Sequence, residues 1–212
     1  KSPIDMACWD IIGKYYKAPI WQLFGGKYGE TINLYRAISQ EHPEKMKESV
    51  KQYKSEGYQR FQLKVGGNYL EDIERIVQVD SILNDSNILV ADANTGWKTH
   101  EALQVIDKTC HLNIYYEQPC ASYNECLLIR EKNNKPFILD ESIFSLNSFL
   151  TAYKDNAMDI INLKISKLGG LTKSKQIRDL CIELNIPMTI EDSWGGDIAT
   201  AAISHLAHST PV

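Results

Sequence analysis

The sequence has no excess of basic residues and no long apolar run. Lys and Arg number 23 against 27 Asp and Glu, so the net charge is −4. Such a balance provides no positive field for the phosphates of nucleic acids or of anionic membranes. No apolar run approaches the roughly 20 residues of a membrane span, and the first residues, KSPIDMACWD, contain no signal-peptide core. These absences favour a cytoplasmic protein that binds small molecules.

Paired cysteines and metal-binding histidine motifs are also lacking. The five cysteines are an odd set without CxxC spacing, which indicates neither a zinc site nor a disulfide framework, so we expect reduced thiols. The five histidines form no HExxH pattern. What the 212 residues do have is an ordinary globular composition, 43% hydrophobic and 24% charged, which is enough for one large core.

From residue 32 onward, short apolar runs alternate with amphipathic segments. This alternation is typical of a parallel sheet with crossover helices, and units of about 25 residues match those of an eightfold barrel. No glycine-rich phosphate loop follows the first run, which argues against the rival doubly wound sheet. The strands that we expect are 32–38, 60–65, 88–92, 114–117, 137–140, 159–165 and 186–191.

The two ends of the chain do not follow this rhythm. Residues 2–16 predict a helix with Ser2 as N-cap and Pro3 as its first residue, and it begins as though another segment preceded it. The last helical segment ends where an eighth strand would be needed to close a barrel. The apolar residues expected on the buried face of the first helix are Ile4, Ala7, Cys8 and Ile11.

Three carboxylates stand at the ends of three successive expected strands. Asp92, Glu117 and Asp140 are separated by 25 and 23 residues. The carboxyl ends of barrel strands meet at one rim, where three acids repel one another unless a cation is present. A hard divalent cation prefers such oxygen ligands. The spacing therefore predicts a Mg²⁺ site, with Mn²⁺ as the alternative cation.

Two lysines stand at or near the ends of the second and sixth expected strands. In a barrel, Lys64 and Lys164 would approach the metal rim from opposite sides. A cation that binds a substrate carboxylate stabilises the enediolate that forms when the α-proton leaves, and a lysine of lowered pKa can take that proton. A single lysine at a strand end more often extends into solvent. The joint placement of both lysines with the acids favours proton transfer.

Several segments, in this order, resemble the barrel domain of the enolase superfamily in its muconate lactonizing enzyme subgroup. They are IDMACWDIIGK with PIWQLFGG, then FQLKVG, VADANTGW, YEQPC, LDES and INLKISKLGGLT. The resemblance implies a TIM-type (β/α)7β barrel. Residues 1–30 would be the lead-in helix and linker from a missing N-terminal capping domain, and residues 31–212 would be an incomplete barrel that lacks the last strand.

The same resemblance implies roles for individual residues. Lys64 and Lys164 would be the acid/base pair on opposite faces of the substrate α-carbon. Asn94 would line the site beside the metal, and Glu141 would bind or tune Lys164. The seventh strand, MTIEDSW, lacks the histidine of the mandelate racemase subgroup, which favours the two-lysine subgroup. The residues that match the family's magnesium ligands are Asp92, Glu117 and Asp140.

One position departs from the family pattern. The second strand usually contains Lys-x-Lys, whereas this chain has Gln62 followed by Leu63 and Lys64. An amide donates a hydrogen bond but does not lower the pKa of a neighbouring lysine by charge repulsion. Lys64 is then either a poorer base or one that depends on the metal for its lowered pKa. In the alternative interpretation, Gln62 fits a larger or differently charged substrate.

The segment EDSWGGDIATAAI resembles members that act on proline betaines or hydroxyprolines. Trp194 would hold a substrate ammonium by cation–π attraction, worth about 0.5–2 kcal/mol, and Asp192 would add negative charge. In the alternative interpretation, Trp194 packs on the next helix and Asp192 is solvated.

The predicted function is therefore metal-dependent abstraction of a proton α to a carboxylate. We expect a racemase or epimerase of an amino-acid derivative such as a proline betaine. The alternatives are a hydroxyproline-type dehydratase, a cycloisomerase, or a truncated barrel that binds metal without turnover. The expected partners are a small carboxylate substrate and further copies of the chain in a homo-oligomer.

Overall fold

The computed structural model describes residues 1–193 and 195–211, which form two compact units. The central unit comprises residues 34–142, and the terminal unit comprises residues 1–33 and 143–212. The seven predicted strands are all present in these units as parallel strands, with ends that differ by up to four residues from the prediction. All five cysteines are free thiols, as the sequence predicts.

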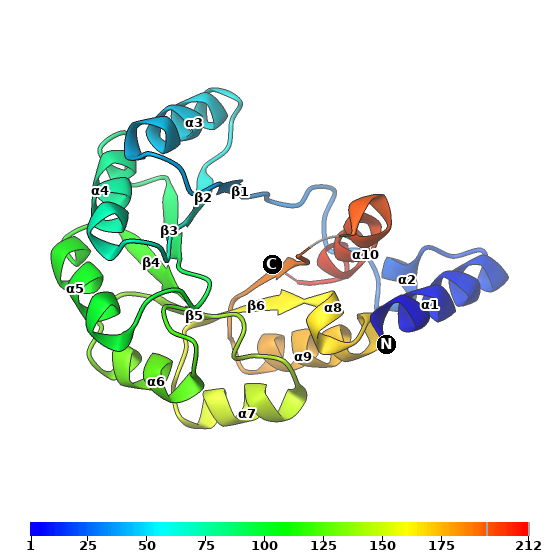
Figure 1. Cartoon of the computed structure of the whole chain (residues 1–212). Helices are drawn as coiled ribbons and strands as arrows, with labels where there is room; N and C mark the ends of the chain where they lie inside the picture. The colour runs from blue at the N-terminus through cyan, green and yellow to red at the C-terminus, as the bar shows by residue number, and fades with distance from the viewer. Residues whose placement is uncertain (194, 212) are drawn as a thin grey trace. The chain divides into compact units, whose positions relative to one another are not determined.

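The central unit is a run of strand and helix pairs. Its five strands lie in the order β1 to β5, and Figure 1 shows α3 to α6 along one side of them. Lys64 pairs in register with Asp92, and Asp92 with Glu117. The elements are β1 (Arg36–Ile38), α3 (Pro43–Ser55), β2 (Arg60–Lys64), α4 (Tyr69–Asp80), β3 (Ile88–Asp92), α5 (Thr99–Thr109), β4 (Ile114–Glu117), α6 (Tyr123–Glu131) and β5 (Phe137–Leu139).

Apolar spacing and side-chain caps explain the helices of the central unit. Met46 and Val50 are fully buried one turn apart on α3, so they form its apolar face. The Asn68 side chain accepts a hydrogen bond from Leu70 N at 3.0 Å and so caps α4, and Ser122 forms a capping box on α6. Each such cap contributes about 1 kcal/mol. Regular helices thus begin directly after the loops that follow the strands.

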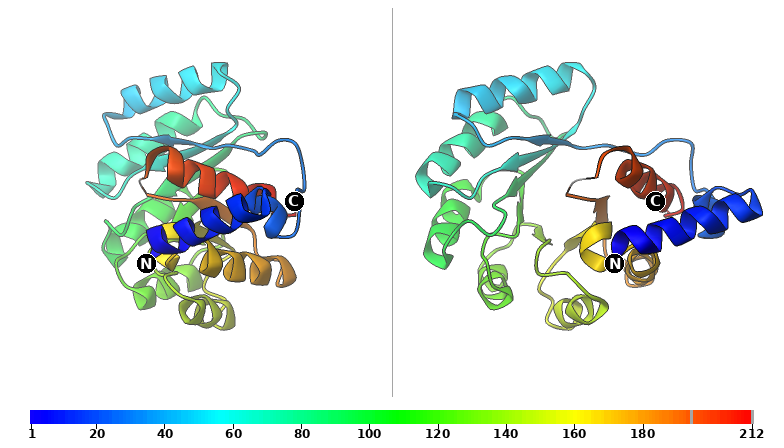
Figure 2. Two further views of the ribbon diagram at one scale, coloured as in Figure 1. Left: turned by 90° about the vertical axis from the view of Figure 1, so that its right-hand side faces the viewer. Right: turned by 45° about the vertical axis from the view of Figure 1, so that its right-hand side comes forward.

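The terminal unit contains two parallel strands and six helices among its described residues. Lys164 at the end of β6 pairs in register with Glu191 at the end of β7. Figure 2 shows α10, in red, running beside α1, in blue. The elements are α1 (Ser2–Tyr16), α2 (Ile20–Leu23), α7 (Leu146–Lys154), β6 (Ile160–Lys164), α8 (Ile165–Leu168), α9 (Leu171–Glu183), β7 (Met188–Glu191) and α10 (Gly196–His208).

A buried arginine holds the terminal unit together. Arg178 on α9 is only 2% exposed, and its guanidinium donates to the carbonyl oxygen and hydroxyl of Ser209, just after α10. It also donates to the Phe24 carbonyl oxygen, after α2, at 3.4 Å. A planar guanidinium with several donors can satisfy backbone acceptors of separate segments at once. Arg178 therefore connects three segments that lie far apart in the sequence.

The predicted orientation of the first helix is wrong. The helix is present, but its N-cap is Lys1 rather than Ser2, and Ile4, Ala7, Cys8 and Ile11 are exposed. The opposite face packs instead, because Trp9 lies edge-on to Phe24 at 4.7 Å between ring centroids and donates to Thr172 Oγ1 at 2.9 Å. The Asp5 carboxylate accepts from the same threonine. Polar and aromatic contacts, rather than the aliphatic stripe, dock α1.

The described part of the chain contains no helix that combines the length and the apolar character needed to cross a membrane.

Candidate active site

Three buried carboxylates lie at the carboxyl ends of neighbouring strands in the central unit. Asp92 ends β3, Glu117 ends β4 and Asp140 follows β5 directly, and all are at most 1% exposed. A carboxylate oxygen of Glu117 and one of Asp140 lie within 4.8 Å of each other. Burial and the charge of Asp92 raise the pKa of Glu117 well above its usual range, and Asp140 adds to the rise. The predicted ligands of this unit therefore form one electrostatic cluster.

The chemistry of this cluster fits a hard divalent cation. Buried carboxylates that lie close together lose their hydration and repel one another, so the free energy of the fully ionised cluster is high. A bound cation supplies the positive charge that lowers it. Oxygen-only donors of this kind suit Mg²⁺ and Mn²⁺ rather than a thiol- or imidazole-preferring metal. Asp92, Glu117 and Asp140 are the residues that could hold it.

Lys64 lies beside the first of these acids. Its ammonium nitrogen is 2.5 Å from Asp92 Oδ2, and its side chain is 33% exposed whereas that of Asp92 is fully buried. The contact follows from the register of β2 and β3, because Lys64 and Asp92 are direct partners at the two strand ends. A partly exposed amine at the edge of a buried acidic cluster is placed to exchange a proton with a bound molecule.

Gln62 points at the second acid. Its amide nitrogen donates to Glu117 Oε2 at 2.8 Å, and the residue is 5% exposed. This hydrogen bond lowers the pKa of Glu117 and opposes the effects of burial and of Asp92. The amide that stands in place of the family's lysine thus stabilises the ionised form of a candidate metal ligand.

The loops after β3 and β5 bring two further predicted residues together. Asn94 has a left-handed backbone, with φ of 43°, and its N–H donates to Asp92 Oδ1 at 2.9 Å. Its side-chain amide donates to Glu141 Oε1 at 3.3 Å. Burial, and then the charge of Asp140, raises the pKa of Glu141. Asn94 and Glu141 therefore extend the polar rim outward from Asp92 and Asp140.

Gln118 is a positioning residue that the motifs did not single out. It is fully buried, has a left-handed backbone with φ of 35°, and its side-chain oxygen accepts from Asp140 N at 3.0 Å and Ser142 N at 3.2 Å. Its amide nitrogen donates to Ser142 Oγ at 2.8 Å. Gln118 thus fixes the backbone of Asp140 relative to the end of β4. The sequence signal that could have indicated this role is the position of Gln118 directly after the predicted ligand Glu117.

In the terminal unit, Lys164 is paired with a carboxylate that was not predicted. Its nitrogen lies 3.3 Å from Glu191 Oε1, and the two side chains are 12% and 11% exposed. Burial, and then the charge of Asp192, raises the pKa of Glu191 to about 7. Glu191 therefore changes its protonation near neutral pH.

The two residues expected to contact the substrate's ammonium differ in what the structure describes. Asp192 Oδ2 accepts from Ser166 N at 3.0 Å, and Oδ1 accepts from the Ser166 hydroxyl and from Ser193 N. Asp192 therefore holds the start of α8 to the loop after β7. Trp194 lies outside the described residues.

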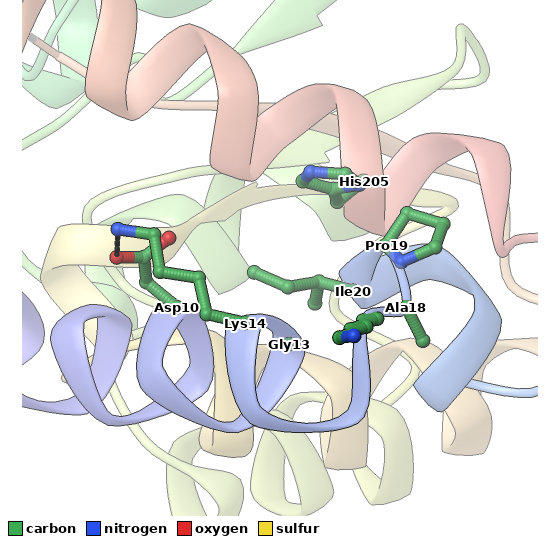
Figure 3. A pocket seen from close by; sticks show the side chains of 8 residues that line it. Asp10, Gly13, Lys14, Ala18, Pro19, Ile20 and His205 are labelled. Carbon is green, nitrogen blue, oxygen red and sulfur yellow. Dashed lines mark hydrogen bonds and ion pairs between the residues drawn. The ribbon is translucent and has the colours of Figure 1, made fainter.

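A shallow hollow of about 270 Å³ lies elsewhere in the terminal unit (Figure 3). Side chains of α1, α2 and α10 line it, with Lys14 paired to Asp10 at one side and His205 at the other. None of the predicted catalytic or metal-binding residues lines this hollow. The hollow is therefore an open groove between helices, and the residues that line it are not those at the strand ends.

The chain matches the family of enolase C-terminal domain-like proteins over residues 45–212. It is 55% identical to a cis-3-hydroxy-L-proline dehydratase of Roseibium aggregatum, in an alignment that covers all of this chain and 58% of that protein. It is 32% identical to an N-succinyl-L-Arg/Lys racemase of Bacillus cereus, in an alignment that covers all of this chain and 58% of that protein. The chain therefore spans somewhat more than half the length of these relatives.

Solved structures agree with these sequence matches. A mandelate racemase/muconate lactonizing enzyme from Roseovarius nubinhibens, crystallised with magnesium, is 31% identical and has a TM-score of 0.92 over 98% of this chain and 59% of its own. The chain belongs to the enolase superfamily, among the mandelate racemase and muconate lactonizing enzyme-like proteins, and its seven strands and their helices are those of the superfamily's barrel domain.

Proposed function

We propose that the protein to which this chain belongs is a divalent-cation-dependent enzyme that removes a proton α to the carboxylate of a small amino acid. The contact that carries this proposal is the one between the Lys64 ammonium and Asp92, at the edge of three buried carboxylates. It joins a candidate base to a candidate metal site in one compact unit. Membership of the enolase superfamily and the names of the relatives support the same class of reaction.

The residues divide into two groups by role. Asp92, Glu117 and Asp140 would hold Mg²⁺, whose charge, when bound, stabilises the enediolate form of the substrate carboxylate. Lys64, as the neutral amine, would take the α-proton, and Lys164 would be the second acid/base group. Gln62 would favour the ionised form of Glu117 through its hydrogen bond, and Glu117 is a ligand only as the carboxylate.

Dehydration of a 3-hydroxyproline is the outcome that we favour. The Roseibium aggregatum relative at 55% identity is named a cis-3-hydroxy-L-proline dehydratase, and identity at that level extends over this entire chain. In such a reaction Lys64 takes the proton from C2, the C2–C3 double bond forms, and the C3–O bond breaks. The departing hydroxide leaves as water with a proton from an acid, for which Lys164 is the candidate.

Racemisation or epimerisation is the second candidate. The specific observation in its favour is that the chain offers two lysines at strand ends, each with a carboxylate partner at 2.5 Å or 3.3 Å. A return of the proton to the opposite face of the α-carbon needs a base and an acid of similar basicity. The relative from Bacillus cereus, at 32% identity, is named a racemase. Both candidates share the first step.

The test is exchange of the α-proton with solvent deuterium, followed by NMR. The substrates would be cis-3-hydroxy-L-proline, proline and N-methylated prolines, each with Mg²⁺ and with EDTA. Exchange should depend on Mg²⁺ and should disappear in Lys64→Ala, whereas Lys51→Ala, which removes an exposed lysine of α3, should leave it unchanged.

The products separate the candidates. Loss of water from the hydroxyproline supports the dehydratase, and exchange of proline derivatives with inversion supports the epimerase. Full exchange in Lys64→Ala would contradict the assigned base. Binding of Mg²⁺ without exchange of any of these substrates, by this chain and by a version extended to the length of the relatives, would leave a metal-binding barrel without turnover.

A further inference from the structure

A fully buried aspartate in the first turn of α4 collects hydrogen bonds from two active-site loops. Asp72 Oδ2 accepts from Gly66 N at 2.9 Å and from Gly67 N at 3.0 Å, both in the loop that follows Lys64. The same oxygen accepts from Trp97 Nε1 at 2.8 Å, in the loop that follows Asp92. One carboxylate oxygen therefore ties the loop after β2 to the loop after β3.

The charge of Asp72 is compensated on its other side. Its Oδ1 accepts from Arg75 at 2.7 Å, and Arg75 in turn donates to the Glu41 carbonyl oxygen at 2.7 Å and pairs with Glu71 at 2.9 Å. A buried carboxylate that has both a guanidinium partner and several N–H donors is held in one orientation. Asp72 is thus a rigid anchor for the loops.

The two loops touch through backbone atoms. A Cβ atom on Gly66 would overlap the carbonyl oxygen of Ala93, which follows Asp92, and a Cβ atom on Gly96 would overlap the carbonyl oxygen of Gly66. Val65 N also donates to the Asp92 carbonyl oxygen at 2.9 Å. A displacement of either loop must therefore be transmitted to the strand ends that carry Lys64 and Asp92.

We propose that Asp72 is a positioning residue that fixes the loops after β2 and β3 and thereby holds the Lys64 ammonium against the Asp92 carboxylate. The functional part of this assignment rests on the proposed function, because it takes Lys64 as the base and Asp92 as a metal ligand. The competing interpretation is that Asp72 and Arg75 only stabilise α4, without effect on the strand ends.

The test compares two substitutions at Asp72 with a matched control. Asp72→Ala removes all four hydrogen bonds, whereas Asp72→Asn has the same shape and keeps one acceptor oxygen for the loop N–H groups. Glu71→Gln alters the neighbouring residue, which is 41% exposed and also pairs with Arg75, and it serves as the control. Near-UV circular dichroism and thermal melting establish that each variant is folded.

Two readouts do not require turnover. The first is the Lys64 ammonium signal in lysine-selective ¹⁵N spectra of the metal-free protein, which should lose its ion-paired shift in Asp72→Ala and keep it in Glu71→Gln. The second is calorimetric titration with Mg²⁺, in which Asp72→Ala should bind about 10- to 100-fold more weakly, since loss of an outer support of a ligand has effects of that size. Asp72→Asn should fall between Asp72→Ala and wild type in both.

The third readout is α-proton exchange. Asp72→Ala should lower kcat by about 100-fold with KM changed far less, because a displaced base slows the proton transfer rather than binding of the substrate. A folded Asp72→Ala variant with a wild-type Lys64 signal and wild-type Mg²⁺ affinity would overturn the positioning role.

If Asp72→Ala does not fold, Trp97→Phe replaces it, because this change removes one of the three N–H donors and leaves the Asp72–Arg75 ion pair. An unchanged Lys64 signal in both Trp97→Phe and Asp72→Asn would then overturn the proposal. If wild type shows no α-proton exchange, the proposed function fails, whereas the Lys64 signal still tests the positioning role by itself.

Discussion

The Lys64 ammonium lies 2.5 Å from Asp92 Oδ2, so the candidate base and a candidate metal ligand share one contact. Asp92 is fully buried and in register with both Lys64 and Glu117, which places a single positive group at the border of a negative cluster. In the proposed metal site, Asp92 would face both the Lys64 ammonium and the divalent cation. We therefore expect the stability of the central unit to depend on divalent cations.

We expect Mg²⁺ to stabilise the protein against unfolding. A ligand that binds only the folded state adds about 2.7 kcal/mol when its concentration is 100 times its dissociation constant. Urea denaturation with Mg²⁺ and with EDTA measures the difference. Asp140→Asn, which removes one candidate ligand, should abolish most of it, and an equal Mg²⁺ effect in this variant would contradict the assignment of the site.

The hydrogen bond from Gln62 to Glu117 should matter for metal affinity. Gln62→Leu has a similar volume but no donor, so the pKa of Glu117 rises further and Mg²⁺ must displace a proton more often. We expect binding to weaken by about tenfold, as for other supports of metal ligands. Calorimetry at pH 6 and pH 8 checks this, and the loss should be larger at pH 6. Gln52→Leu, at an exposed position of α3, is the control.

The stability of the terminal unit should depend on pH through Glu191. Its pKa, about 7, is above the usual value of 4.5, so the folded state holds a proton that the unfolded state releases between these values. The stabilisation is complete below pH 4.5 and is lost as the pH rises to about 7, and at roughly 1.4 kcal/mol per pH unit it amounts to at most about 4 kcal/mol. Glu191→Gln should remove this slope. A slope of unchanged size in denaturation between pH 5 and pH 8 would show that other groups cause it.

The unexpected orientation of α1 predicts which of its residues matter for stability. Trp9 packs on Phe24 and donates to Thr172, so Trp9→Ala should destabilise the chain by about 2 kcal/mol. Ile11 is 65% exposed, so Ile11→Ala should change stability by less than about 0.5 kcal/mol. Thermal denaturation of the two variants compares them directly. A larger loss in Ile11→Ala would restore the orientation expected from the apolar pattern.

The alternation of apolar runs and amphipathic segments predicted all seven strands, because each strand is a short run with at least one buried residue in the parallel sheet. It also predicted which acids end those strands, since Asp92 and Glu117 are the last residues of β3 and β4. Periodicity could not reveal which face of α1 packs, because the face that docks uses Trp9 and Asp5 in specific contacts. Aliphatic spacing alone carries no information about such partners.

The supports of the site were equally hidden. Gln118 acts through a side-chain oxygen that reaches Asp140 N, and Glu191 acts through an ion pair with Lys164, so both roles exist only after the strands have paired. A sequence pattern locates the acids that end strands, but it does not show which neutral or charged neighbour orients them. The candidate ligands were therefore predictable, and the residues that hold them were not.

The backbone contact of Gly66 with Ala93 and Gly96 also limits how such a protein can diversify. A side chain at Gly66 or Gly96 would push apart the loops that follow Lys64 and Asp92. Substitutions that adapt the site to a different substrate are therefore expected at residues that project from other loops. At these two glycines the backbones of neighbouring loops leave no room for a side chain.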